Sequence, residues 1–325
     1  MRLNEIIQDL EITSRKGEQD PLIGKISFDS RELEEGTLFV AIRGVLADGH
    51  DYLDQAIAAG AAAVVCEDPG DRSGAGIPLI CGPDSRRALA QMASRWYDNP
   101  STELSLVGIT GTNGKTTIAT LLHQVHQRMG FKAGLISTIE VLIGGESRPA
   151  THTTPDPLQI NAALRDMVEA GCEYCFMEVS SHAIDQKRVE DLEFNGGIFT
   201  NLSRDHLDYH KDFREYLYVK KLFFDRLSKD AFALVNGDDK NGKVMLQNCS
   251  AEQHIYSLRS LCDFRGKITE MHLEGSAMEI NGNELWVKLP GRFNASNLLC
   301  VYGASILLGH HPDDVTSALS ELDPV

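Results

Sequence analysis

Short apolar runs alternate with amphipathic stretches along the first hundred residues. The runs have β-strand character, are separated by Gly, Asp and Pro, and lie at residues 26–30, 37–42, 62–66 and 77–81. Ala-rich stretches with helical character lie between them, at 51–60 and 85–97. This alternation predicts a small α/β domain over residues 1–98. A turn cluster at 98–101 places Asn before Pro, which disfavours a continuing helix and marks the domain boundary.

A larger strand–helix alternation runs through residues 99–325. An apolar run at 104–109 predicts a buried strand, and a helix with a single apolar stripe follows from residue 115. Further strand candidates lie at 133–138, 174–179, 196–201 and 232–236. Such alternation is typical of a mostly parallel sheet with helices on both faces, so the fold class is α/β. Period-2 alternation at 262–289 predicts antiparallel hairpins at the sheet edge, and two helices at 292–309 and 312–321 follow.

Composition narrows the class of protein. At about 150 residues per domain, 325 residues correspond to two domains. A formal charge of −16 argues against a general nucleic-acid-binding protein, and the longest uncharged apolar run, at 298–309, is shorter than the ~20 residues that cross a bilayer. Seven cysteines, an odd number, indicate free thiols in a reducing compartment, so we expect a cytoplasmic protein. Cys172 and Cys175 have no second pair at metal-site spacing and are expected to pack in the core.

The sequence TGTNGKTT at 110–117 joins the strand at 104–109 to the amphipathic helix. Strand, glycine-rich loop and helix N-terminus form the arrangement in which backbone N–H groups and the helix dipole hold phosphates. Gly111 and Gly114 allow the backbone to approach a phosphate closely, and Lys115 would reach the β- and γ-phosphates. The Thr116 hydroxyl would ligate Mg²⁺. The motif departs from the usual pattern at Ile109, where Gly is usual. The motif as a whole predicts ATP as the ligand.

Two charged residues elsewhere in this region also point to chemistry. Glu178 ends an apolar strand, and ligands of open α/β sheets bind at the carboxyl edge, so its carboxylate is a candidate Mg²⁺ ligand. Lys220 lies in the apolar stripe of a predicted helix, whereas Lys221 points about 100° away from that stripe. Because a buried ammonium is costly unless paired, Lys220 is either a functional amine or a lysine whose charged end reaches solvent.

Several segments together resemble the Mur ligase family, ATP-dependent enzymes that form amide bonds during peptidoglycan assembly. They are FDSRELEEGTLFVAIRGVLADGHDYL, GITGTNGKTT, HTTPDPLQ, MEVSSHAIDQKRV, FTNLSRDHLDYH, YLYVKKLFF and LPGRFNASN, and they reach from about Phe28 to Asn297. The combination of HTTPDP, EVSSHA and GRFN resembles the branch that adds the third residue of the stem peptide.

The resemblance implies roles for individual residues in these segments. The implied catalytic residues are Lys115, Glu178, His206 and Lys220. The implied cofactor-binding residues are Gly111, Thr112, Asn113, Gly114, Lys115, Thr116, Thr117, Asn294 and Asn297. The implied substrate-binding residues are Ser30, Arg31, Thr153, Thr154, Ser180, Gln186 and Arg188. The implied Mg²⁺ ligands are Thr116, Glu178 and Lys220, the last as a carbamate formed with CO₂.

Some of these residues also have ordinary structural interpretations. The sequence Thr-Pro-Asp at 154–156 is suited to capping the helix that follows. Asn294 and Asn297 have the residue type and position of helix N-caps. The sequence DSR at 29–31 is by itself only a turn, and an isolated histidine such as His206 is usually structural.

The resemblance implies an ATP- and Mg²⁺-dependent ligase that adds diaminopimelate or lysine to UDP-MurNAc-L-Ala-D-Glu through an acyl phosphate. Family members have a third, C-terminal domain that binds the incoming amino acid, and this sequence ends where that domain would begin. We therefore expect the 325-residue chain alone to bind the UDP substrate without ligating it. The alternatives are a binding fragment without ligase activity and a different ligase of the superfamily, such as a folylpolyglutamate synthetase, which the N-terminal DSR segment disfavours.

Overall fold

The computed structural model describes residues 1–44, 47–72, 74–150, 152–203 and 209–322, and His206 lies outside these ranges. The chain forms two compact units. The N-terminal unit comprises Met1–Asn99, Asp156–Ala162 and Gln186–Leu192, and the central unit comprises Pro100–Pro155, Ala163–Asp185 and Glu193–Val325. The sequence predicts a single boundary at residue 98, whereas two later segments also belong to the N-terminal unit.

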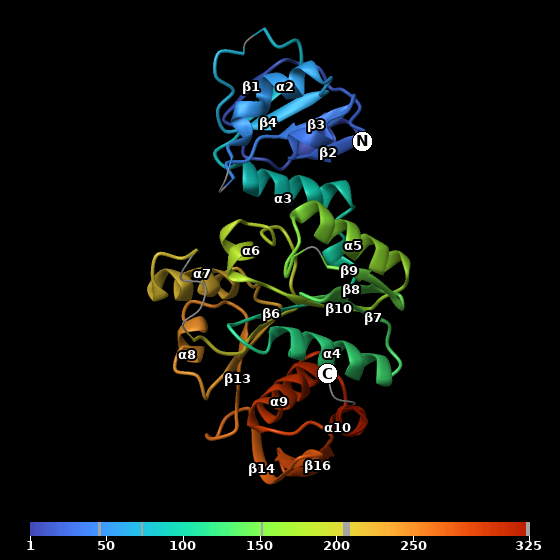
Figure 1. The fold of residues 1–325 in the computed structure, drawn as a ribbon, viewed down its shortest axis with the longest axis vertical. Coiled ribbons are helices and arrows are strands. Elements are labelled where there is room, and N and C mark those ends of the chain that lie inside the picture. The colour runs from blue at the N-terminus through green and yellow to red at the C-terminus, as the bar shows by residue number, and fades with distance from the viewer. Residues whose placement is uncertain (45–46, 73, 151, 204–208, 323–325) are drawn as a thin grey trace. The chain divides into compact units, whose positions relative to one another are not determined.

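The N-terminal unit is a small α/β sandwich (Figure 1). Its elements are α1 (Leu3–Ile7), β1 (Ser14–Lys16), β2 (Lys25–Ser27), β3 (Thr37–Val40), α2 (Leu53–Ala58), β4 (Ala63–Cys66), β5 (Leu79–Cys81) and α3 (Ser85–Trp96), with short 3-10 turns at Ser30–Glu32 and Gly49–Tyr52. The strand order is β1-β5-β4-β3-β2, parallel except for β1. Successive residues of β3 face opposite sides: Leu38 joins the core beneath α1 and α3, and Phe39 joins the core beneath α2.

The central unit is built on one large mixed sheet. Its strands are β6 (Ser105–Thr110), β7 (Ala133–Ile136), β8 (Glu140–Ile143), β9 (Glu146–Pro149), β10 (Tyr174–Glu178), β11 (Gly196–Phe199), β12 (Phe232–Asn236), β13 (Glu252–Ser257), β14 (Phe264–His272), β15 (Gly275–Ile280) and β16 (Asn283–Val287). Their order is β16-β15-β14-β13-β12-β11-β6-β10-β7-β8-β9. The strands from β14 to β7 run parallel, and an antiparallel hairpin extends the sheet at each end.

Helices cover both faces of this sheet (Figure 1). They are α4 (Lys115–Arg128), α5 (Pro157–Glu169), α6 (Ser181–Asp185), α7 (Phe213–Asp225), α8 (Gly242–Met245), α9 (Arg292–Leu307) and α10 (Pro312–Ser320), after a 3-10 turn at Pro100–Thr102. One face packs Val107 of β6 against α4 and α9 in a single core. On the other face, a Cβ at Gly108 would lie 2.6 Å from the Phe223 ring of α7, so the glycine lets that helix approach closely. The predicted α/β class with helices on both faces is confirmed.

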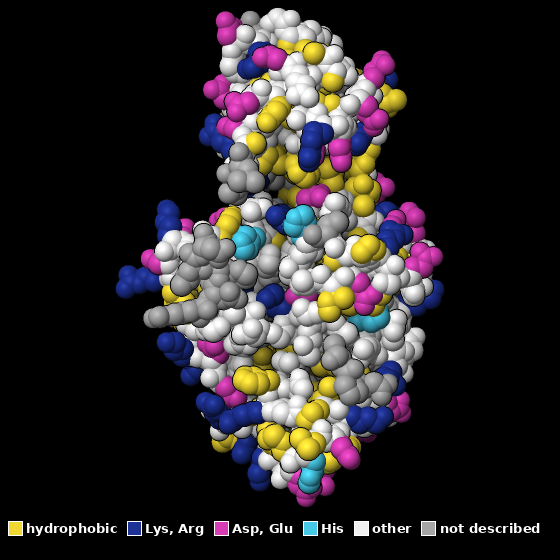
Figure 2. Space-filling view, in the orientation of Figure 1, with side chains coloured by type: hydrophobic (Ala, Val, Ile, Leu, Met, Phe, Trp, Pro, Cys, Tyr) yellow, Lys and Arg dark blue, Asp and Glu magenta, His cyan; other side chains and the backbone are white. Residues whose placement is uncertain are grey.

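The visible surface carries charges of both signs. On the face shown in Figure 2, Lys and Arg side chains lie among Asp and Glu side chains. Of the helices that the structure describes, none is both long and apolar enough to cross a membrane. On this face, an anionic ligand would therefore be attracted by individual residues of a site and by backbone N–H groups rather than by a broadly basic area.

A cluster of aromatic rings, with buried His126 and half-buried His310, lies where α4 meets the end of α9. The ring of His126 is fully buried, and its Nδ1 lies 2.8 Å from the Leu122 carbonyl oxygen. The ring centroid of His310 lies 4.8 Å from that of His126, and that of Tyr174 lies 4.7 Å away. Burial, with smaller contributions from the nearby His310 and His123, lowers the pKa of His126 to about 3. The imidazole is therefore neutral in the folded protein at ordinary pH.

The buried His126 predicts that the central unit loses stability in mild acid. Below its ordinary pKa of 6.5 the unfolded chain binds a proton, whereas folded His126 does so only near pH 3, so stability falls as the pH drops between these values. Each pH unit below 6.5 removes about 1.4 kcal/mol, so this group accounts for a loss of about 2 kcal/mol between pH 7.5 and pH 5. Urea unfolding at pH 7.5 and pH 5 measures it. His126→Phe, which keeps an aromatic ring in the cluster, should show a smaller loss, and an unchanged pH dependence in that variant would contradict the assignment.

Candidate active site

The loop between β6 and α4 has the backbone geometry of a phosphate-binding loop. Gly111 has a φ of +146° and Gly114 a φ of +87°, conformations that L side chains rarely adopt. A Cβ at Gly111 would lie 1.9 Å from the Thr200 hydroxyl, so the position also lacks space for a side chain. Helical bonding in α4 begins with the Ile118 N–H donating to the Gly114 carbonyl at 2.9 Å. The N–H groups of the preceding turn, residues 115–117, therefore point out of the helix end, where they suit a phosphate.

The amine of Lys115 lies over this loop. Its Nζ donates to the Gly111 carbonyl and to the Thr112 carbonyl, each at 3.0 Å. The cation is thus held beside the backbone that would receive the phosphates. This placement agrees with the predicted role of Lys115 at the β- and γ-phosphates.

Glu178 faces the loop from the carboxyl end of β10. Register with β6 pairs it with Ile109, and its carboxylate is almost completely buried. The Thr116 hydroxyl donates to Glu178 Oε1 at 2.9 Å, and the Thr138 N–H donates to the same oxygen at 2.7 Å. Oε2 is buried and has no hydrogen-bond partner among the described residues. A buried carboxylate oxygen without a partner is costly, so this oxygen indicates a ligand.

The donor set fits Mg²⁺. This ion prefers oxygen ligands and usually takes one or two carboxylates together with substrate phosphates. Glu178 and the Thr116 hydroxyl supply such oxygens beside the phosphate loop. Within the described ranges there is no cluster of three or more His, Cys, Asp or Glu side chains suited to a metal, so the phosphates would complete the coordination. The pair Cys172 and Cys175 is free and buried, as the sequence predicts for core residues.

Lys220 is buried inside the site. Its side chain is 1% exposed, and its Nζ donates to the Gly111 carbonyl at 3.1 Å and to the Thr110 hydroxyl at 3.3 Å. The alternative of a lysine whose charged end reaches solvent is therefore wrong. Lys221 instead pairs with Asp225 on another side of α7. The carbamate on Lys220 stays a prediction.

Asn297 packs against the phosphate loop. A Cβ at Gly114 would lie 3.0 Å from its Oδ1. The N-cap of α9 is Gly291, and Asn294 Nδ2 donates to the Pro290 carbonyl at 2.8 Å. The interpretation of these asparagines as N-caps is therefore wrong. Their contact with the nucleotide base stays a prediction.

Thr154 has a structural role at the end of β10. Its hydroxyl donates to the Glu178 carbonyl at 2.8 Å and accepts from the Ser180 N–H at 3.1 Å. Asp156, rather than Thr154, caps α5, because its carboxylate accepts from the Leu158 N–H at 2.9 Å. Thr154 therefore fixes the backbone on either side of Val179. Direct substrate contact by Thr154 or by the half-buried Thr153 stays a prediction.

The remaining predicted substrate residues are held by local hydrogen bonds. The Arg31 guanidinium binds Asp29, and these bonds lower the pKa of Asp29 to about 2. The segment around Ser30 is a 3-10 turn, as the sequence indicates for DSR alone. The Arg188 guanidinium donates to Gln186 Oε1 at 2.7 Å. The Ser180 hydroxyl accepts from the Ala183 N–H at 3.1 Å, at the start of α6.

The sequence interpretation missed Thr138, Thr200 and Asn201. Thr138 binds Glu178, and the other two contact the phosphate loop. All three follow the carboxyl ends of parallel strands, the edge where ligands of such sheets bind. Their position relative to β7 and β11 is the signal that could have found them.

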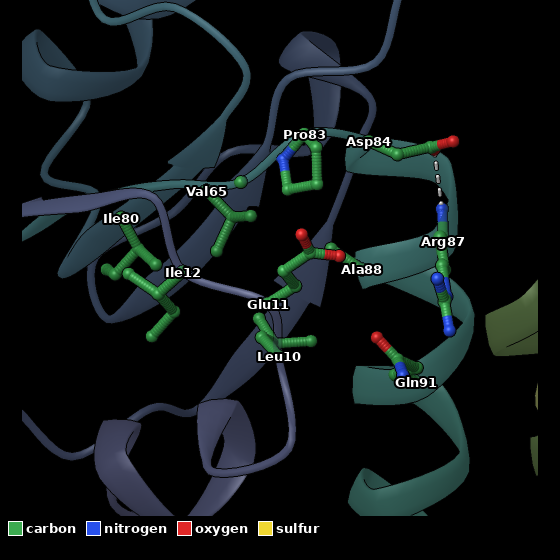
Figure 3. A pocket seen from close by; sticks show the side chains of 11 residues that line it. Leu10, Glu11, Ile12, Val65, Ile80, Pro83, Asp84, Arg87, Ala88 and Gln91 are labelled. Atoms are coloured by element: carbon green, nitrogen blue, oxygen red, sulfur yellow. Dashed lines mark hydrogen bonds between the residues drawn. The ribbon is translucent and has the colours of Figure 1, made fainter.

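A small pocket lies elsewhere, in the N-terminal unit (Figure 3). It opens between residues 10–12, the strands β4 and β5, and the helix α3. Its walls are mainly apolar, from Ile12, Val65 and Ile80, and Glu11 also lines it (Figure 3). None of the predicted site residues lines this pocket, so we assign it no part in the site.

Comparison with known proteins identifies the family. Residues 109–305 match the Mur ligase middle domain, and residues 22–97 match the Mur ligase family catalytic domain. The UDP-N-acetylmuramoyl-L-alanyl-D-glutamate–2,6-diaminopimelate ligase of Parabacteroides distasonis is 54% identical over 325 residues, 100% of this chain and 67% of the relative. The ligase of the same name from Cytophaga hutchinsonii is 48% identical over 324 residues, 99% of this chain and 67% of the relative. The chain therefore belongs to the Mur ligase family.

A solved structure gives the same result. A ligase structure with the same enzyme name superimposes with a TM-score of 0.83 at 25% identity, covering 100% of this chain and 67% of the other. The chain thus spans about two thirds of the length of these relatives. The matches run through the N-terminal unit as well as the central unit, so the folylpolyglutamate synthetase alternative is not favoured.

Proposed function

We propose that this chain acts in an ATP-dependent ligase that joins 2,6-diaminopimelate to UDP-MurNAc-L-Ala-D-Glu. The observation that carries the proposal is the Glu178 carboxylate, which is buried against Thr116 of the phosphate loop with one oxygen lacking a partner. The names of the relatives supply the substrates, including diaminopimelate rather than lysine. The acyl phosphate intermediate is proposed from the family resemblance.

The residues of the site suit the transfer of a phosphoryl group to a carboxylate. The charge that develops on the transferred group needs cations and N–H donors more than it needs a protein nucleophile. Lys115 and the N-terminus of α4 supply both at the phosphate loop. Thr116 and Glu178 would hold Mg²⁺, with Lys220 as a carbamate in the proposed full set, and the ion would supply further neutralisation of phosphate charge.

The UDP substrate would use a different set of residues. The proposed set is Ser30, Arg31, Thr153, Thr154, Ser180, Gln186 and Arg188. Arg188 is suited to a phosphate or carboxylate because its planar guanidinium can form two parallel hydrogen bonds. Gln186 already orients that guanidinium through Oε1. The Arg31 guanidinium already donates to the Asp29 carboxylate, so it would bind the substrate and Asp29 at the same time.

Arg188→Ala is expected to weaken binding of UDP-MurNAc-L-Ala-D-Glu by about tenfold or more, because a charge-assisted pair is lost. Calorimetric titration measures this, and Arg188→Lys should fall between the variant and the native protein because it keeps only the charge. Equal affinity in all three proteins would contradict the role of Arg188.

For the function itself, mass spectrometry of products formed by the full-length protein with diaminopimelate or lysine is the test. A preference for lysine, or a native protein that binds no UDP substrate, would overturn the proposal.

A further inference from the structure

Two residues that follow β11 hold the phosphate loop from outside. The Thr200 hydroxyl donates to the Asn113 carbonyl at 2.7 Å, and Asn201 Nδ2 donates to the same carbonyl at 3.0 Å. In return, the Asn113 N–H donates to Asn201 Oδ1 at 3.1 Å. Both polar groups of the Asn113 backbone are therefore satisfied by these two residues. Thr200 and Asn201 lie within the family segment FTNLSRDHLDYH, but the resemblance gave neither of them a role.

The segment that follows β11, residues 200–203 (the tail of β11), also fixes Thr112, the loop residue before Asn113. The Thr112 N–H donates to the Asn201 carbonyl at 2.8 Å. The Thr112 hydroxyl accepts from the Ser203 N–H at 3.0 Å and lies 3.2 Å from the hydroxyl of Tyr216 on α7. Thr112 is accordingly held through its backbone and its side chain at once.

These contacts determine which N–H groups remain for a ligand. The N–H groups of Thr112 and Asn113 are used within the protein, so they do not compete for the phosphates. The N–H groups of the first turn of α4, residues 115–117, have no acceptor within the helix and remain available to a ligand. The residues that follow β11 thus remove two N–H groups of the loop from the set that a phosphate could use.

We propose that Thr200 and Asn201 are positioning residues that hold the loop in its phosphate-binding conformation and thereby set the affinity for ATP. The inference rests on the proposed ATP site and goes beyond it by assigning residues that do not touch the nucleotide. The loop contains two glycines with positive φ, and such a backbone has much conformational freedom to lose. Ordering it before the ligand arrives removes that loss from the cost of binding.

Thr200 offers a matched pair of variants for the test. Thr200→Val keeps the shape but removes the donor to Asn113, and Thr200→Ser keeps the donor. The Thr200 side chain is almost completely buried, so stability must be followed by thermal unfolding in parallel. We expect Thr200→Val to raise the dissociation constant for Mg²⁺–ATP by about tenfold, and Asn201→Ala by more, because it loses two side-chain hydrogen bonds to the loop. Thr200→Ser should restore most of the affinity.

Calorimetry with Mg²⁺–ATP and with the UDP substrate, together with amide hydrogen exchange, separates the outcomes. Faster exchange at residues 112 and 113 with weaker ATP binding and unchanged binding of the UDP substrate is the expected result. Native affinity for ATP in folded Thr200→Val and Asn201→Ala would overturn the inference, as would an equal loss in Thr200→Val and Thr200→Ser. Absence of ATP binding by the native protein would instead mean that the proposed function fails.

Discussion

Lys115→Ala is expected to weaken ATP binding by about a hundredfold or more without unfolding the protein. The Lys115 amine lies over the phosphate loop, where it donates to two loop carbonyls, and the residue is only half-buried. Its loss removes the cation that meets the β- and γ-phosphates but little core packing. Calorimetric titration with Mg²⁺–ATP gives the affinity, and thermal unfolding gives the stability.

Lys132→Ala is the matched control for this variant. Lys132 lies in the same unit, is exposed, and donates to the Ala170 carbonyl at 3.0 Å. Removing it changes the net charge equally but leaves the loop intact, so ATP affinity should not change. Undiminished ATP affinity in folded Lys115→Ala would refute the assignment of the phosphate loop.

Lys220→Ala is expected to lower the rate of ligation by about a hundredfold or more while the UDP substrate still binds. The reason is the position of the amine, which is buried against Thr110 and Gly111 beside the phosphate loop. The proposed carbamate on this amine would add a ligand for Mg²⁺. Ligation by the full-length protein and titration with the UDP substrate are the two measurements.

Lys221→Ala is the natural comparison, because Lys221 pairs with Asp225 and lies on another side of α7. It should retain ligation. Short carboxylates added to Lys220→Ala should restore part of the rate by filling the place of the carbamate. Equal losses at the two lysines would contradict the assignment, and so would a crystal structure, grown with CO₂ and Mg²⁺–ATP, in which the Lys220 amine is unmodified.

Most of the fold follows from the periodicity of apolar residues. Buried strands such as β6 and β10 are continuous apolar runs, and α4 carries a single apolar stripe. The hairpin strand β9 was missed because its residues, ESRP, are all exposed and carry no pattern. Its pairing with β8 depends on the tight turn at Gly144 and Gly145 and on the edge that β8 offers. The short strands β1 and β8 and the six-residue strand β13 were missed as well.

The site was predictable where a motif determines the backbone, and less so where tertiary contacts do. The loop sequence specified the positions of Gly111, Gly114 and Lys115. The roles of Thr154 and Asn201 depend on which strand ends lie side by side, and strand order is not visible in one sequence. Burial of Lys220 was indicated by its helical stripe, but its partners on β6 and the loop were not.

At Asn113, the backbone anchors the loop, while the side chain takes no part in that anchoring. Its backbone N–H and carbonyl are both bound by the tail of β11, while its side chain is exposed. Gly111, by contrast, excludes any side chain through both its φ and its lack of space. A protein engineer who wishes to alter nucleotide preference therefore has a position at 113 where side chains can be varied in a library while the loop backbone keeps its anchors.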